Sequence, residues 1–75
     1  MIIVLAGNHL QYSSFLRDND LTRRDAVYIS HPLMARGYDR ESTLLATYGT
    51  WINNPAYQDD YIRMLLNTLP RYEGA

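Results

Sequence analysis

The chain has 75 residues, with no cysteine, 47% hydrophobic residues and 20% charged residues. This composition is typical of a globular domain and argues against a disordered chain, a disulfide framework or a thiolate metal site. The basic residues are all arginine, and the net charge of -1 gives no general attraction for nucleic acid or an anionic membrane. We therefore expect one domain over residues 1–75, without a nucleic-acid or membrane partner.

The first predicted element is a strand over residues 2–6. The run Ile2-Ile3-Val4-Leu5-Ala6 is continuously apolar and is stopped by Gly7, which is typical of a strand buried on both faces in a parallel sheet. The run is short and has no basic leader, so it indicates neither a signal peptide nor a membrane span. We expect a cytoplasmic protein.

A helix is predicted over residues 8–18, directly after this strand. Tyr12, Phe15 and Leu16 recur at helical spacing, Asn8 is a suitable N-cap, and Asn19 is a stop signal. The first two elements are therefore a strand and a helix joined by a tight turn.

Two further short strands are predicted in the middle of the chain. Thr22 and Asp25 match a capping box that leads into a strand over residues 26–30, which His31-Pro32 ends. One helical turn over residues 32–35 and a polar stretch then precede a strand over residues 43–48.

The final helix is predicted to begin with Asn54 as N-cap and Pro55 in its first turn, and to stop at Pro70. Residues 71–75 are then expected to be a frayed tail. The apolar stripe of this helix consists of Tyr57, Tyr61, Ile62, Leu65, Leu66 and Leu69.

The element order β-α-β-(turn)-β-α predicts a small Rossmann-like α/β fold. Its parallel sheet would have three strands in the order 2-1-3, with the two main helices on opposite faces.

Ligands of open parallel sheets bind beyond the carboxyl ends of the strands. The predicted fold places Asn8, His9, His31, Thr50 and Trp51 there, and these five residues are the predicted lining of a small-ligand or nucleotide site. His9 and His31 match no metal-ligand spacing, and the chain has neither a GxGxxG motif nor a P-loop. We therefore expect no metal and no cofactor. No nucleophile, base and orienting group can be assembled from the sequence, so catalysis is the least favoured function.

Aromatic residues indicate a partner surface instead. Seven tyrosines and Trp51 exceed what a three-stranded core can bury, and Tyr, Trp and Arg are enriched in the centres of protein interfaces. The predicted interface contains Trp51, Tyr57, Tyr61 and Met64. The alternative is that the tyrosines line the edge of the core with their hydroxyls in water.

Several spaced motifs resemble those of short uncharacterised proteins encoded by actinobacterial phages. They are the strand that ends in Gly7-Asn8, the tyrosine-containing strand at 27–30, Arg36-Gly37, and Gly49-Thr50-Trp51 before the last helix. The resemblance implies an accessory protein made in the host cytoplasm, and it carries over no catalytic residue. The use of arginine without lysine agrees with a GC-rich genome.

Two functions therefore follow from the sequence. The first is a non-enzymatic interaction or regulatory protein that forms a homodimer and binds a host protein, because a chain this short buries only about 60% of its unfolded surface and gains stability from association. The alternative is small-ligand or nucleotide binding at the carboxyl end of the sheet.

Overall fold

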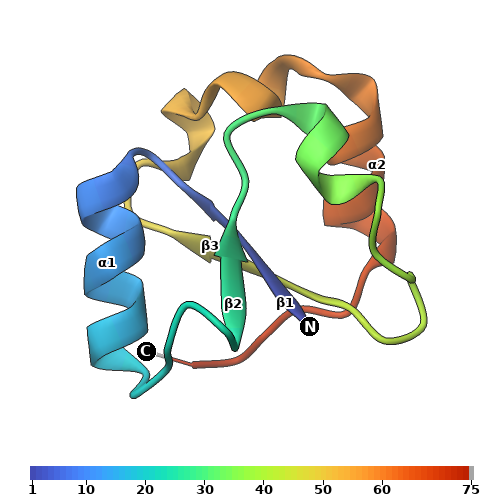
Figure 1. The fold of residues 1–75 in the computed structure, drawn as a ribbon. Helices are drawn as coiled ribbons and strands as arrows, with labels where there is room; N and C mark the ends of the chain where they lie inside the picture. Colours follow the sequence, from blue (N-terminus) through green and yellow to red (C-terminus); the bar gives the residue numbers. More distant parts are fainter. Residues whose placement is uncertain (75) are drawn as a thin grey trace.

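A computed structural model describes residues 1–74, whose elements follow the predicted order (Figure 1). The strands β1 (Ile2–Ala6), β2 (Ala26–Tyr28) and β3 (Leu44–Tyr48) form a parallel sheet in the order β2-β1-β3. The α-helices are α1 (His9–Asp18) and α2 (Asp60–Thr68). Single 3-10 turns are η1 (Pro32–Ala35), η2 (Trp51–Asn53) and η3 (Pro55–Gln58). The predicted Rossmann-like α/β fold with β1 in the centre is confirmed.

The central strand β1 is buried on both of its faces. Its side chains alternate between the two sides of the sheet, with Ile3 and Leu5 on one side and Val4 and Ala6 on the other. Tyr12, Phe15 and Leu16 of α1 pack against Val4 and Ala6. On the other face, Ile3 and Leu5 are covered by Ile62 and Leu65 of α2 and by Leu69, which directly follows it. The two main helices thus lie on opposite faces of the sheet, as predicted (Figure 1).

The start of the final helix differs from the prediction. Asn54 and Pro55 begin only the 3-10 turn η3, and α2 starts at Asp60. Asp59 has an extended backbone, and its carboxylate accepts a hydrogen bond from the Tyr61 N–H at 2.8 Å. Because Asp59 is itself a good N-cap, it ends the first turn and starts a new helix, so Tyr57 lies outside α2.

The frayed tail expected over residues 71–75 is wrong for Arg71 and Tyr72. Arg71 forms a parallel bridge with Leu45, whose N–H donates to Pro70 O and whose carbonyl accepts from Tyr72 N–H, both at 2.9 Å. The Tyr72 ring packs edge-on against Phe15, with 5.8 Å between ring centroids. The free edge of β3 offers unpaired backbone groups, so it holds this segment in place. Ala75 lies outside the described residues.

The local signals of the first half of the chain are confirmed. Asn8 caps α1 through a hydrogen bond from the Gln11 N–H, and Asn19 lies at its C-terminal end. The Asp25 carboxylate accepts a hydrogen bond from the Thr22 N–H, and the Thr22 hydroxyl accepts one from the Arg24 N–H, a pattern close to that of a capping box. Within residues 1–74, neither helix has the length and apolarity needed to cross a bilayer.

Candidate functional site

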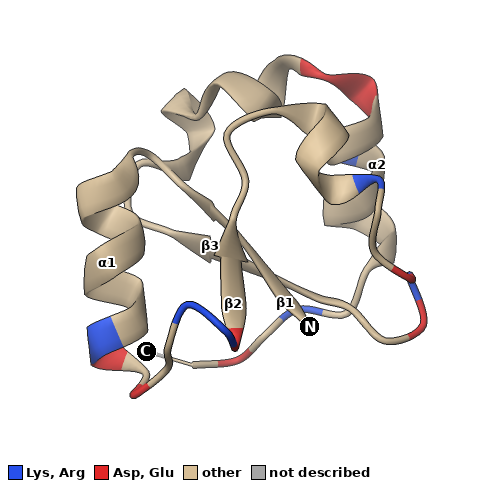
Figure 2. Cartoon of the chain, viewed as in Figure 1, with Lys and Arg blue, Asp and Glu red and all other residues tan. Residues whose placement is uncertain are grey.

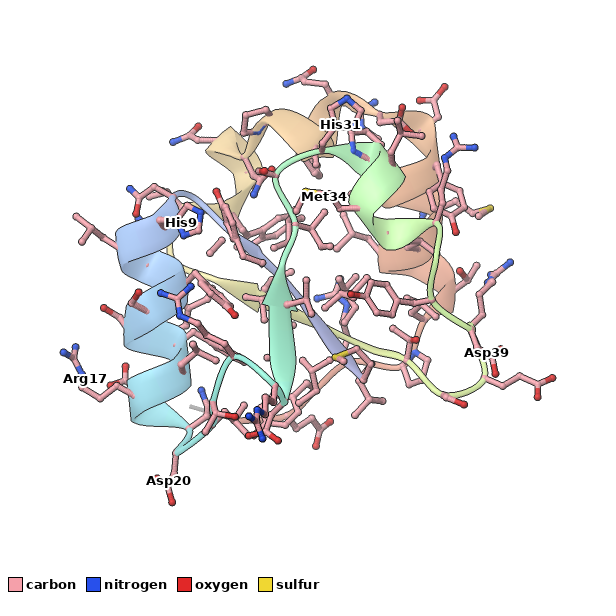
Figure 3. The ribbon with its side chains drawn as sticks, viewed as in Figure 1. His9, Arg17, Asp20, His31, Met34 and Asp39 are labelled. Atoms are coloured by element: carbon pink, nitrogen blue, oxygen red, sulfur yellow. The ribbon has the colours of Figure 1, made fainter. Side chains whose placement is uncertain are left out.

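The five residues predicted to line a ligand site all lie at the carboxyl end of the sheet. Asn8 and His9 follow β1, His31 lies between β2 and η1, and Thr50 and Trp51 follow β3. Figure 3 shows His9 above the start of α1 and His31 apart from it, beside η1. In the described part of the chain, no group of three His, Cys, Asp or Glu residues comes together to hold a metal ion.

Three of these residues serve local structure. The side chain of Asn8 caps α1, and His31 Nδ1 accepts a hydrogen bond from the Leu33 N–H at 3.2 Å, which caps η1. The His9 ring packs against Tyr28 at a tilt of 52°, with 4.5 Å between ring centroids. The two histidines therefore act separately, one in a cap and one in an aromatic contact.

Gln11, which the sequence analysis did not single out, connects the first and third strands. Its Oε1 atom accepts hydrogen bonds from the Gly7 N–H at 2.8 Å and the Thr50 N–H at 2.9 Å, and its Nε2 donates to Thr50 Oγ1 at 2.9 Å. After β1 the chain passes to α1 on one face of the sheet, and after β3 it passes to α2 on the other face. Gln11 therefore lies between two strands whose connections go to opposite faces, which is where folds of this kind bind ligands.

Glycine is required on both sides of the Gln11 carboxamide. A Cβ atom at Gly7 or at Gly49 would overlap Gln11 Oε1, and Gly49 also has a φ of 62°. That backbone conformation disfavours every residue with a side chain. The two glycines that follow β1 and β3 were the sequence signal for this close approach.

Asn54 is the second amide that closes this end of the sheet, and sequence reasoning assigned it only a helix cap. Its side chain is 1% exposed. Its Nδ2 donates to Ala6 O at 2.6 Å and to Ile29 O at 2.7 Å, while its Oδ1 accepts from the Ala56 N–H at 2.8 Å. One buried amide therefore joins the ends of β1 and β2 to η3.

The Gln11 and Asn54 amides use their hydrogen-bonding groups inside the protein rather than toward solvent. No pocket is found on the surface formed by residues 1–74, and within that range no buried side-chain nitrogen or oxygen lacks a hydrogen-bond partner. The structure thus brings Thr50 together with Gly7 and Gln11, but it does not bring His9 and His31 into the same contact.

The predicted interface residues form two groups of contacts on the α2 side, and their rings pack against the same core cluster. Trp51 meets Tyr57 edge-to-face with 5.4 Å between ring centroids. The Arg63 guanidinium lies 5.3 Å from the Tyr57 ring centroid, and Arg36 lies 4.7 Å from that of Tyr61. We call this set, with the exposed Met64, the aromatic strip. Its members are Arg36, Trp51, Tyr57, Tyr61, Arg63 and Met64.

The tyrosines and the tryptophan of the aromatic strip are half-buried and pack against the core under α2. These tyrosines therefore also line the edge of the core, which was the alternative to an interface role in the sequence analysis. Arginine over the face of a tyrosine is an attractive cation–π contact, and Arg63 Nε also donates to Tyr57 O at 3.1 Å. These contacts hold the rings in place while part of each ring stays accessible.

A second aromatic cluster lies on the α1 side and was not predicted. Tyr12 packs 5.4 Å from Tyr28 between ring centroids, and its hydroxyl donates to Ala26 O at 2.6 Å. Burial raises the pKa of Tyr12, while the nearby Arg23 charge lowers it in part. This buried hydroxyl has a clear structural role in tying α1 to β2.

Charge is distributed unevenly between the two ends of the sheet. All arginines and acids fall within residues 17–25, 36–41, 59–63 and 71–73. The segments that directly follow the strands, residues 7–11, 29–35 and 48–58, carry none of them, and the nearest charges are Arg36 and Asp59 at the ends of two of these segments (Figure 2). This end nevertheless has exposed apolar side chains, which are Leu10 (80% exposed), Leu33 (66%), Ile52 (57%) and Met34 (42%).

No family model matches the chain, and neither a curated protein nor a solved structure matches it significantly.

Proposed function

We propose that this protein is a non-enzymatic interaction protein that associates with itself and binds a host protein through the aromatic strip. The resemblance seen in the sequence suggests a role as a phage accessory protein in the host cytoplasm. The observation that carries the proposal is that Trp51, Tyr57 and Tyr61 are half-buried and that an arginine lies over each of the two tyrosine rings.

The composition of the aromatic strip is that of an interface centre. Trp, Tyr and Arg are the residues most enriched among those that dominate binding energy, and methionine is enriched in interfaces as well. The Trp51–Tyr57 contact and the two arginine–tyrosine contacts fix the rings before a partner binds. Less conformational freedom is then lost on association, which favours affinity.

A matched pair of charge reversals tests this proposal. Arg36→Glu removes the guanidinium from the Tyr61 ring, whereas Arg17→Glu makes the same change on an exposed residue at the far end of α1. Each variant is immobilised on a resin and used to capture a host protein. We expect wild type and Arg17→Glu to retain that protein equally. Arg36→Glu should bind it about tenfold more weakly, a loss of about 1.4 kcal/mol in binding free energy.

The retained protein is then purified, and its dissociation constant with each variant is measured by titration calorimetry. Equal binding by Arg36→Glu and Arg17→Glu would exclude the aromatic strip as the binding surface.

Anion or nucleotide binding at the carboxyl end of the sheet is the second candidate. The observation in its favour is that the Gly7 and Thr50 N–H groups point at one oxygen atom, Gln11 Oε1. If the Gln11 side chain turned away, a phosphate or carboxylate oxygen would meet the same two donors.

Trp51 fluorescence tests the second candidate, because Trp51 directly follows Thr50. Wild type and Gln11→Ala are titrated with inorganic phosphate and with a panel of nucleotides. A saturable change in wild type that becomes stronger in Gln11→Ala supports a ligand site that glutamine guards. No change in either protein rejects this candidate.

A further inference from the structure

We infer that the outer edge of β3 is a binding site for an extended peptide in which an arginine precedes an aromatic residue, and that the chain's own residues 70–72 occupy this site. We call these residues the terminal segment. Figure 1 shows the chain leaving the end of α2 and crossing to the side of α1, and on this path it bridges to Leu45. The site is separate from the aromatic strip, and the inference does not depend on the proposed function.

The first argument is the backbone pairing of the terminal segment, which is that of an added strand. The Leu45 N–H donates to Pro70 O, and the Tyr72 N–H donates to Leu45 O, both at 2.9 Å. Extended peptides bind to a free sheet edge through backbone bonds of this kind, and side-chain contacts then give the specificity. The terminal segment therefore lies on β3 as a bound peptide would.

The second argument is that side chains of the terminal segment are recognised on both faces of the sheet. On the α2 side, the Arg71 guanidinium donates to Leu66 O at 3.3 Å and lies 3.5 Å from Thr47 Oγ1. On the α1 side, the Tyr72 ring meets Phe15 edge-to-face with 5.8 Å between ring centroids. Because neighbouring residues of a strand point to opposite faces, the edge selects an arginine followed by an aromatic residue.

The third argument is that the terminal segment can separate from the folded body. The buried residues of both core clusters lie between Ile3 and Leu69, and Tyr72 is only partly buried at the margin of one cluster. Pro70 and Arg71 are exposed. Chain ends with few buried contacts open at a much lower free energy than core strands. The edge of β3 can therefore become free while the sheet stays folded.

The opposite edge of the sheet provides a contrast. At β2, the Ala26 N–H donates to Thr22 O at 3.3 Å, and Ala26 O accepts from the Tyr12 hydroxyl at 2.6 Å. These partners belong to α1 and to the turn before β2, so they are part of the folded body. At β3, the partners of Leu45 come from the terminal segment, and β3 is the edge that a peptide can reach.

The terminal segment acts as a built-in competitor for this site. A tethered ligand has an effective concentration in about the millimolar range, so a peptide in solution binds weakly as long as the terminal segment is in place. Tyr72 supplies the aromatic contact that holds the segment. Its replacement should therefore loosen the segment and make the site available.

A fluorescently labelled peptide with the sequence of residues 69–74, Leu-Pro-Arg-Tyr-Glu-Gly, tests the inference. Fluorescence anisotropy measures its binding to full-length wild type, Tyr72→Ala and the control Glu73→Ala, which changes an exposed neighbour. We expect the dissociation constant for Tyr72→Ala to be at least tenfold lower than for wild type, and Glu73→Ala to behave as wild type. Peptides with alanine in place of the tyrosine or of the arginine should bind to Tyr72→Ala more weakly, the first by at least tenfold.

The inference is overturned if the peptide does not bind to Tyr72→Ala, if it binds equally to Tyr72→Ala and wild type, or if the alanine peptides bind as well as the original. Circular dichroism must show that Tyr72→Ala is folded, and an unfolded variant also overturns the inference, because the terminal segment would then be part of the fold.

Hydrogen exchange on wild type gives a measurement without any substitution. The amides of Leu45 and Tyr72 are bonded across the edge, so they should exchange together, with protection factors at least tenfold lower than those of the amides in β1. Equal protection in both places would show that the edge does not open on its own and would contradict the inference.

Discussion

The two ends of the sheet are held together in different ways. At the carboxyl end, Gln11 reaches Thr50 and Asn54 reaches Ala6, across 39 and 48 residues of sequence. At the amino end, the side-chain bonds of Thr22 to Asp25 span only three residues, while the terminal ammonium of Met1 donates to Ser42 O across 41 residues. The loops that follow the three strands carry no charge up to Arg36 and Asp59, whereas the segment between α1 and β2 carries several charges (Figure 2). Substitutions of Gln11 or Asn54 should therefore disturb the whole fold, and substitutions in the turn of Thr22 and Asp25 only that turn.

The largest effect is expected for Asn54→Ala. This change leaves the Ala6 and Ile29 carbonyls and the Ala56 N–H without their partner in a buried place. We expect a loss of about 3 kcal/mol in the free energy of unfolding, because each buried group left unsatisfied costs roughly 1–3 kcal/mol. Urea denaturation measures the loss. The exposed neighbour Asn53 is the control, and an Asn53→Ala loss as large as that of Asn54→Ala would refute the argument.

Gly49→Ala is expected to have the next largest effect. The added Cβ would overlap Gln11 Oε1 and force a side chain into the left-handed conformation, so we expect a loss of about 2 kcal/mol, of which the backbone contributes roughly 1–2 kcal/mol. Gly37→Ala is the control, because a Cβ there meets no atom within 4 Å. If both alanine variants have the same melting temperature, the contact between Gly49 and Gln11 does not stabilise the fold.

Tyr12→Phe tests a buried bond on the α1 side and should cost about 1 kcal/mol, the usual net value of one hydrogen bond. It should also change the response to alkali. Burial raises the pKa of Tyr12 in the folded protein, so its contribution is fully present below the pKa of an unfolded tyrosine and is lost as the pH rises through the higher folded value.

Wild type should therefore lose more stability than Tyr12→Phe when the pH is raised above about 10. Denaturation at pH 8 and pH 11 measures the difference. Parallel curves for the two proteins would show that ionisation of Tyr12 does not contribute.

The smallest effect is expected at the amino end, for Asp25→Asn. Hydrogen bonds from the backbone and side chain of Thr22 hold the pKa of Asp25 below its ordinary value. The stability that they provide is present above the ordinary pKa of an aspartate and is lost as the pH falls through the lower folded value.

Wild type and Asp25→Asn should therefore differ at neutral pH and converge in acid, below about pH 4. Glu41→Gln is a charge-matched control on an exposed side chain, and a similar convergence there would point to overall charge rather than to the Thr22 bonds.

Local sequence patterns were sufficient to predict the sheet order, the helix α1 and the capping turn at Thr22. The predicted start of the last helix was wrong because Asn54 and Asp59 are both good N-caps, and sequence alone does not show that Asn54 is held by the ends of β1 and β2. The tail prediction was wrong because Arg71 and Tyr72 bond to the edge of β3, a contact with no local signal.

The candidate site was predicted in position but not in chemistry. The rule that strands of a parallel sheet share one carboxyl end placed Asn8, His9, His31, Thr50 and Trp51 correctly at that end. The role of Gln11 depends on a partner 39 residues away, and a lone glutamine in the first helix gives no sign of it. Tertiary contacts of this kind decide whether the carboxyl edge of a parallel sheet has room for a ligand.

The Asn54 amide also has a consequence for how the protein opens. Segments that share one buried tie cannot separate one at a time without breaking it, so the ends of β1, β2 and η3 should open in a single cooperative event. Native-state hydrogen exchange would then show similar opening free energies for amides in these three segments, while amides in the turn at Thr22 exchange independently and sooner.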